Sequence, residues 1–323
     1  MAHTQQTSLA SSQGLTGRGL PPISKARRRA DSARRLRRGL PALALVVPAA
    51  AFYAAFVLTP LVSTIQYSFY DWDGITPGTW AGIENYINLF TDPDLIGPIL
   101  NAFQLILYFS IIPVILGLIA ASLIRKFGAS RLALVSRTVL FLPQVIPLVA
   151  AGIMWTWLMA TDGAVNQIMR LIGLGSLTRA WLGDFDTALP AVGVIGAWVS
   201  LGLCMLLLLA GMTKIDPALY EAVRLDGAGA IREFFAVTLP GIRQEVSVAI
   251  TITVISALRS FDIIYISTQG GPGNRTLVPG LEIYYLAFFE REIGQASALA
   301  VALMVLVLAI VLPLNRLARG RED

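Results

Sequence analysis

The sequence predicts an all-α, polytopic membrane protein with six transmembrane helices. Two observations carry this prediction: the composition is very apolar, and the apolar residues are gathered in long stretches. Hydrophobic residues fill 55% of the 323 positions and charged residues only 14%, and the mean hydropathy is +0.68. A soluble domain of this length is much more polar. A helix needs roughly 20 apolar residues to cross a bilayer. Six such stretches occur, at 40–63, 103–124, 138–161, 188–212, 246–266 and 293–315.

These stretches are continuous, and five of the six contain no charged residue. Lipid offers no partner to backbone N–H and C=O groups, so a spanning segment must be a helix or a strand of a closed barrel. Barrel strands alternate apolar and polar residues, and these stretches do not. The first stretch follows a run of arginines, as a signal peptide would, but it is too long for an h-region of about 7–15 residues. We therefore expect it to be retained as a helix.

The distribution of Lys and Arg predicts the orientation of the helices. Nine of these residues lie before position 40, and further groups lie in the loops at 125–137 and 213–245. The intervening loops hold few, with none between 66 and 102. By the positive-inside rule both termini and the basic loops are cytoplasmic. The predicted organisation is a disordered basic cytoplasmic tail at 1–39, a six-helix domain at 40–316 and a cytoplasmic C-terminal tail at 317–323.

Composition also excludes several kinds of chemistry. The net charge of +5 arises from the cytoplasmic asymmetry and suits anionic lipid rather than nucleic acid. Cys204 and His3 are the only cysteine and the only histidine. An internal disulfide, a His/Cys zinc site and His-based catalysis are therefore excluded. We expect no metal and no cofactor.

The loops between the stretches carry recognisable local signals. The first outer loop has turn residues at Asp73-Gly74 and Pro77-Gly78, and its aromatic residues suit the membrane–water interface. The second, at 162–187, has apolar residues at helical spacing, which predicts a short amphipathic helix. The third has a glycine-rich turn at 267–274. It does not follow the phosphate-loop pattern.

The loop at 213–243 has the strongest local pattern. Asp216-Pro217 is a helix start signal, with the carboxylate at the N-cap and proline in the first turn. Gly227 can take the left-handed conformation that ends such a helix. A second helix with an apolar face is expected to end at Pro240. By itself this pattern also fits an amphipathic hairpin lying on the membrane surface.

The same loop resembles the EAA loop of bacterial ABC importer permeases. The stretch 221–240 reads EAVRLDGAGAIREFFAVTLP. It carries Glu221-Ala222, a glycine six residues after the glutamate and a final Leu239-Pro240. Val223 and Val237 replace the alanine and isoleucine of the family pattern, both conservatively. In that family the loop is where a separate ATPase docks. The resemblance assigns ATPase coupling to Glu221, Ala222, Asp226, Gly227, Ala228, Leu239 and Pro240.

Further segments resemble the carbohydrate-type branch of these importers, which includes maltose and glycerol-3-phosphate permeases. They are RSFDIIYISTQGGP at 259–272, SFYDWD at 68–73 and Asn85-Tyr86. The resemblance implies a multi-pass bacterial cell-membrane protein that forms the path for a sugar-like solute. It implies a second homologous permease, two copies of a cytoplasmic ABC ATPase and an extracytoplasmic solute-binding protein as partners. ATP hydrolysis would belong to the ATPase, so this chain is not expected to be an enzyme.

Arg259 and Asp262 are the only charged residues inside the six stretches. Charge at membrane depth is costly and needs a partner or a polar cavity. If both lay on one helix, the i, i+3 spacing would let them pair. Alternatively, Arg259, Asp262 and Tyr265 line a polar translocation path. Both interpretations are compatible with the sequence.

Other classes of membrane protein remain to be weighed. An ion-coupled secondary transporter of small polar solutes would need acidic residues near the midplane and inverted repeats. Asp262 is the only acid in the stretches, and the two halves show no repeat. A membrane-embedded enzyme lacks a nucleophile–base pair. An ABC exporter half would carry a fused ATPase, and no nucleotide-binding motif occurs.

Overall fold

The computed structural model describes residues 46–128 and 130–319. The chain divides into two units, Met1–Pro60 and Leu61–Asp323, which are treated separately. The basic tail expected at 1–39 lies outside the described residues, as do residues 320–323 of the expected C-terminal tail.

Nearly all of the described elements are helices. In chain order, with η for π- and 3₁₀-helical turns, they are η1 (Ala54–Leu58), α2 (Thr59–Tyr67), β1 (Tyr70–Asp71), β2 (Thr79–Trp80), α3 (Glu84–Thr91), α4 (Pro93–Ile106), η2 (Leu107–Ile111), α5 (Ile112–Phe127), α6 (Arg131–Val145), α7 (Leu148–Leu158), α8 (Ala164–Leu171), η3 (Gly175–Leu177), α9 (Ala188–Met212), α10 (Pro217–Leu225), α11 (Ala230–Glu233), η4 (Phe234–Thr238), α12 (Leu239–Gly241), α13 (Arg243–Leu258), α14 (Asp262–Ser267), α15 (Pro279–Tyr285), η5 (Leu286–Glu290) and α16 (Ile293–Arg319).

The described part of the first unit is helical throughout. It belongs to a helix that runs from Val46 to Tyr67 and is long and apolar enough to cross a membrane. A π-helical turn, η1, interrupts the α-helical hydrogen bonding, and Thr59 Oγ1 donates to the carbonyl of Ala54 at 3.1 Å across it. Phe52 and Phe56 are 67% and 66% exposed, as expected for side chains that contact lipid or another subunit.

The number of candidate spans among the described residues lies between four and six. Four helices qualify individually: Val46–Tyr67, Pro93–Phe127, Ala188–Met212 and Ile293–Arg316. Two pairs of bent helices qualify only if each pair is taken as one span. The prediction of a helical membrane protein is confirmed. The sequence predicts one continuous helix for each stretch. The third and fifth stretches differ from this prediction, because each is interrupted.

The third stretch is broken in its middle. Helices α6 and α7 meet at an angle of 101°. The break lies at Ile146, whose backbone is extended (φ −74°, ψ 129°), and Pro147 follows it. A residue before proline is sterically disfavoured in the helical region, so α6 ends there. A window of apolar composition cannot detect such a break, because Pro147 lies within an otherwise apolar run.

The fifth stretch is also divided. Helix α13 ends at Leu258, and α14 begins only at Asp262. A separate bend, of 72°, lies before this stretch, between Ala230–Gly241 and Arg243–Leu258. The expectation of one helix over 246–266 is therefore wrong, because the backbone of Arg259 to Phe261 leaves the helical path.

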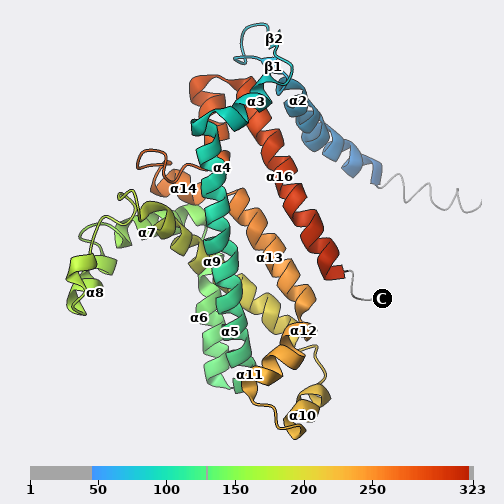
Figure 1. Cartoon of the computed structure of the whole chain (residues 1–323), viewed down its shortest axis with the longest axis vertical. Coiled ribbons are helices and arrows are strands. Elements are labelled where there is room, and N and C mark those ends of the chain that lie inside the picture. The colour runs from blue at the N-terminus through green and yellow to red at the C-terminus, as the bar shows by residue number, and fades with distance from the viewer. Residues whose placement is uncertain (1–45, 129, 320–323) are drawn as a thin grey trace, which may run out of the picture. The chain divides into compact units, whose positions relative to one another are not determined.

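Helix α9 lies at the centre of the second unit (Figure 1), where it contacts α5, α6, η2 and α13. Small residues on α9 allow this close packing, as is common between membrane helices. A side chain at Gly196 would overlap the ring of Phe109, and one at Gly202 would overlap the backbone of Leu140 and Phe141. The largest buried cluster gathers here, with Val192 and Ile195 fully buried.

Two ends of the second unit can be distinguished (Figure 1). The β1–β2 hairpin and α3 lie at one end, called the hairpin end, and α10 and α11 lie at the other. The turn expected at Asp73-Gly74 is confirmed: the Asp73 carboxylate accepts from the backbone N–H of Ile75 and Thr76 at 2.9 and 2.7 Å. These bonds hold the pKa of Asp73 below its ordinary value. The short helix expected within 162–187 is α8.

Candidate functional site

The 213–243 loop folds as two helical segments joined by a tight bend. Asp216 caps α10 by accepting from the backbone N–H of Ala218 at 2.9 Å, with Pro217 in the first turn. At the other end Gly227 has a φ of +77°. The backbone N–H of Gly227 donates to the carbonyl oxygen of Arg224, and the backbone N–H of Ala228 donates to the carbonyl oxygen of Val223. This is the Schellman arrangement, in which a left-handed residue satisfies the last carbonyls of a helix. Both predicted signals are confirmed.

The second segment differs in one detail from the expectation. A helical stretch runs from Ala230 to Gly241, so Pro240 does not end it. A π-helical turn, η4, precedes Leu239 and Pro240. A wider turn at this point accommodates a residue that has no N–H to donate.

The loop is attached to the end of α5 by charged and aromatic contacts. Glu233 accepts from Arg224 at 2.8 Å and from Arg125 at 3.2 Å. The Arg125 guanidinium also lies 3.9 Å from the ring centre of Tyr220, a favourable cation–π geometry. The Tyr220 hydroxyl lies 3.3 Å from that of Thr238. The carboxylate of Glu233 raises the pKa of Arg224.

Sequence reasoning missed this attachment. Glu233 lies nine residues after Arg224, too far for a helical pair, and Arg125 lies on another helix. The bend at Gly227 is what brings Arg224 and Glu233 together. The sequence offers one signal for this contact: Glu233, Arg125 and Arg224 all lie in segments predicted to be on the same side of the membrane.

The surface of the loop is apolar and accessible. Leu225, Ile231 and Phe235 are 88%, 77% and 62% exposed. Of the residues assigned to ATPase coupling, Glu221, Ala222, Asp226, Gly227 and Pro240 are exposed and Ala228 and Leu239 are half-buried. Exposed apolar side chains next to a bend without bulky groups form a surface suited to a protein partner.

A cavity of about 340 Å³ with both polar and apolar lining lies between the helices and is partly open to the surface. Both helix breaks described above open onto it: Gln144, Ile146 and Leu148 come from the α6–α7 break, and the 259–263 segment comes from the α13–α14 break. Broken helices at membrane depth are tolerated where they line a cavity, and their free backbone groups are typical of solute sites. Both breaks therefore line the same cavity, which makes it a candidate site.

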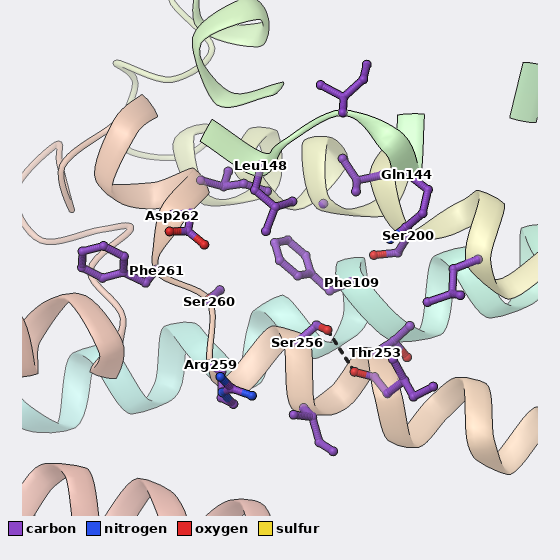
Figure 2. A pocket seen from close by; sticks show the side chains of 17 residues that line it. Phe109, Gln144, Leu148, Ser200, Thr253, Ser256, Arg259, Ser260, Phe261 and Asp262 are labelled. Carbon is purple, nitrogen blue, oxygen red and sulfur yellow. Dashed lines mark hydrogen bonds between the residues drawn. The ribbon is translucent and has the colours of Figure 1, made fainter. Parts of the chain in front are cut away.

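Hydroxyl and amide side chains line much of this cavity (Figure 2). They are Gln144 of α6, Ser200 of α9, Thr253 and Ser256 of α13, and Ser260. Ser260 is 8% exposed, and its Oγ has no hydrogen-bond partner among the described residues. A buried hydroxyl without a partner is costly, so it is available to a bound solute or water. None of these residues was singled out from the sequence, because hydroxyls in apolar stretches commonly bond their own helix.

Arg259 and Asp262 both line the cavity, but they are not a pair. Arg259 caps the end of α13 and Asp262 begins α14, with Ser260 between them (Figure 2). The ion pairs of the described residues do not include either one. The hypothesis that they pair along one helix is therefore wrong, because there is no common helix. Both residues are exposed, and both line the cavity.

Tyr265 lies apart from the cavity lining. Its ring stacks on Phe261, with centres 5.2 Å apart, and meets Tyr284 edge-on at 5.6 Å. Tyr265 therefore belongs to an aromatic cluster beside the cavity. Its contribution to a solute path would be to hold Phe261, which does line the cavity.

The fold and this site define a membrane component of a solute transport system. Residues 96–318 match the model of the family described as binding-protein-dependent transport system inner membrane component, and the chain belongs to that family. It is thus a multi-pass inner-membrane permease subunit of a binding-protein-dependent ABC transport system. This decides against the ion-coupled transporter that the sequence had left open, and it makes the role of this chain transport rather than catalysis.

Similar proteins include several permeases of such systems. A probable ABC transporter permease protein, YurN of Bacillus subtilis (strain 168), is 35% identical over 86% of this chain and 96% of its own length. The diacetylchitobiose uptake system permease NgcF of Streptomyces coelicolor is 31% identical over 84% of this chain and 81% of its own. The sulfoquinovosyl glycerol permease SmoG of Agrobacterium fabrum is 29% identical over 87% of this chain and 91% of its own length.

A solved structure has the same fold. A chain of a bacterial ABC transporter involved in the import of the acidic polysaccharide alginate aligns with a TM-score of 0.76 at 24% identity, covering 91% of this chain and 100% of that one. The transporter has also been solved with an alginate pentasaccharide-bound periplasmic protein, and the TM-score there is 0.75.

Proposed function

We propose that this chain forms half of the membrane path of an importer for a sugar or sugar-like solute, and that the 213–243 loop couples it to a separate ATPase. The coupling residues are the exposed ones at the bend: Glu221, Ala222, Asp226 and Gly227, with Ala228, Leu239 and Pro240 supporting them. The observation that carries this proposal is the exposed apolar surface around a left-handed glycine, clamped to α5 through Glu233.

The proposed topology has six spans, with each bent helix pair, or part of it, counted as one crossing. Both termini and the 213–243 loop are cytoplasmic, and the hairpin end is outside. The distribution of Lys and Arg supports this orientation. The domain boundaries follow from it: a basic tail at 1–39, the membrane domain at 40–316 and a short tail at 317–323.

The partners we infer are a second homologous permease, two copies of a cytoplasmic ABC ATPase and an extracytoplasmic solute-binding protein. ATP-driven closure of the ATPases would move the docked loop, and the rigid contact with α5 would carry the motion into the bundle. Membership of a binding-protein-dependent family supports this set of partners.

The solute class follows from relatives and from the cavity. Diacetylchitobiose and sulfoquinovosyl glycerol, named for two relatives, are both rich in hydroxyl groups. The cavity offers side chains that hydrogen-bond such groups, including Gln144, Ser200 and Ser260. Arg259 and Asp262 are the charged residues of the proposed path.

The direct test is uptake. A strain that lacks this gene should fail to take up one radiolabelled glycoside or oligosaccharide of a panel, and the cloned gene should restore uptake. The ATPase should co-purify with the chain. Normal uptake of the whole panel in the deletion strain, together with a chain that purifies without an ATPase, would contradict the proposal.

A further inference from the structure

A second polar cavity lies at the hairpin end and has a strongly acidic wall. Its volume is about 470 Å³, and it is enclosed by the start of α4, by α15 and η5, and by the residues around the start of α16. Within the ranges that the structure describes, no Lys or Arg lines it. None of its carboxylates belongs to an ion pair, since the ion pairs of the described residues use only Glu233 and Glu245. The five acids that line it are Asp92, Asp94, Glu282, Glu290 and Glu292.

Glu282 is the unusual member of this group. It is only 7% exposed, and its carboxyl group has no hydrogen-bond partner within the described part of the chain. Its carboxyl oxygens are not among the fully buried atoms that lack a partner, so they reach the cavity. A carboxyl group that is largely withdrawn from water and has no donor is costly in its charged form. Burial, followed by repulsion from Glu290, Asp94, Asp92 and Glu292, raises the pKa of Glu282 to about 7. A positive charge placed in the cavity would therefore stabilise the ionised form of Glu282 and offset the repulsion from its acidic neighbours.

The missing charge is better supplied by a protein than by a metal ion. Among the described residues, no three His, Cys, Asp or Glu side chains are placed to hold a metal. The acidic surface also continues into a neighbouring cavity of about 260 Å³, which shares Asn88, Glu292 and Gln295 and adds Asp71 and Glu84. Acids spread over two adjacent cavities match a basic protein surface, whose Lys and Arg side chains are long enough to enter them.

We propose that this acidic cavity receives a lysine or arginine side chain of the extracytoplasmic solute-binding protein, which pairs with Glu282. The proposal rests on the function proposed above, which places the hairpin end outside and supplies that partner. Glu282 is the buried anchor of the contact, and the exposed Glu290 and Glu292 form its rim. Buried charge pairs at interfaces set the stability of a complex more than rim charges do.

Docking is then linked to pH. A cation pairs with deprotonated Glu282, so docking releases its proton. With a pKa of about 7, the deprotonated fraction rises about tenfold between pH 6 and pH 8, and docking should tighten by that factor. The neighbours that face Glu282 do not reverse this sign, because none of them is a basic group. From α4, its own helix, η5 and the start of α16 they are Asp92, Asp94, Tyr285, Glu290 and Glu292.

The test is the affinity of the solute-binding protein encoded with this transporter for the complete complex in nanodiscs, at pH 6 and pH 8. We expect about tenfold tighter binding at pH 8. Glu282→Gln, which keeps the shape of the side chain, should bind with nearly the same low affinity at both pH values. Asp186→Asn is the matched control, because Asp186 is an exposed carboxylate at the start of α9, outside the cavity. It should keep the wild-type affinity and its pH dependence.

If Glu282→Gln assembles poorly, a variant of the exposed rim acids still tests the proposal. Glu290→Gln with Glu292→Gln should weaken binding at pH 8 severalfold. Binding that is independent of pH in the wild type, or unchanged in both acidic variants, would overturn the cavity proposal and leave the importer function standing. Absence of binding at either pH, together with normal uptake in the deletion strain, would overturn both.

Discussion

Two glycines at the bend of the 213–243 loop differ in the conformation that they require. Gly227 has a φ of +77°, whereas Gly229 has a φ of −77°, and a Cβ would meet nothing within 4 Å at either position. A side chain at Gly227 is strained by about 1–2 kcal/mol, but one at Gly229 is not. Gly227→Leu should therefore reduce solute-stimulated ATP hydrolysis of the reconstituted complex severalfold, and Gly229→Leu should affect it much less. Equal activities in the two variants would show that the bend does not control coupling.

The separation of Arg259 and Asp262 leads to a prediction opposite to that for an ion pair. Arg259→Gln and Asp262→Asn should each assemble at wild-type yield and lower uptake roughly tenfold, as for loss of a hydrogen bond from a charged group. The double variant should not recover, because neither charge compensates the other. Tyr265→Phe, with its ring outside the cavity lining, is the control and should transport normally. Recovery in the double variant, by a double-mutant comparison, would restore the ion-pair hypothesis.

Glu282 should also affect the stability of the complex in the absence of its partner. Its pKa is raised from 4.5 to about 7, so the folded chain binds a proton that the unfolded chain has lost in this range. The stabilisation is fully present below pH 4.5 and is lost as the pH rises to about 7. The thermal midpoint in detergent should therefore decline over this range through this group, and Glu282→Gln should remove that part of the decline. An identical pH profile in the variant would contradict the assigned pKa.

At the scale of elements, the glycines of α9 determine how closely the helices approach. A side chain at Gly202 would meet the backbone of Leu140 and Phe141, which cannot move aside as a flexible side chain could. Gly202→Leu should therefore abolish assembly of the purified complex. Gly97→Leu, in α4 and with nothing within 4 Å, should assemble normally. A normal yield for Gly202→Leu would mean that α6 and α9 are not in this contact.

The elements also show how far the sequence determines the fold. The six apolar stretches and the capping of α10 by Asp216 depend on composition and local geometry, so they could be predicted from the sequence. The break after Ile146 also has a local cause, because Pro147 follows it in the sequence. Proline alone does not predict a break, however, since it also occurs inside intact membrane helices. Pro313 in α16 is an example.

The contacts that build the site could not be predicted in the same way. The attachment of Glu233 to Arg125 joins residues 108 positions apart, and the cavity combines two helix breaks with α9. Such contacts depend on tertiary packing, which no single segment encodes. For the same reason the sequence leaves open whether Arg259 and Asp262 pair along one helix or line a path, and only the fold places both at one cavity.

At the scale of the whole molecule, the proposed topology places the loop and the hairpin end on opposite sides of the membrane. The chain allows this to be measured with thiols, because Cys204 is its only cysteine and is buried. In a Cys204→Ala background, Ala222→Cys places one thiol on the exposed surface of α10, and Asp186→Cys places one just before α9, in a loop that the proposed topology puts outside. Both positions are exposed, so each should react with a maleimide that cannot cross the membrane.

The central claim is that the 213–243 loop is the cytoplasmic docking surface of a separate ATPase, and protection of the thiol at position 222 by the ATPase tests it most directly. In inside-out vesicles the Ala222→Cys variant should be labelled, and addition of the purified ATPase should slow its labelling at least tenfold, as for a thiol covered by an interface that excludes water. The Asp186→Cys variant should be labelled only in right-side-out vesicles and at the same rate with or without the ATPase. Labelling of Ala222→Cys from the outside, or at a rate that the ATPase does not change, would contradict the account.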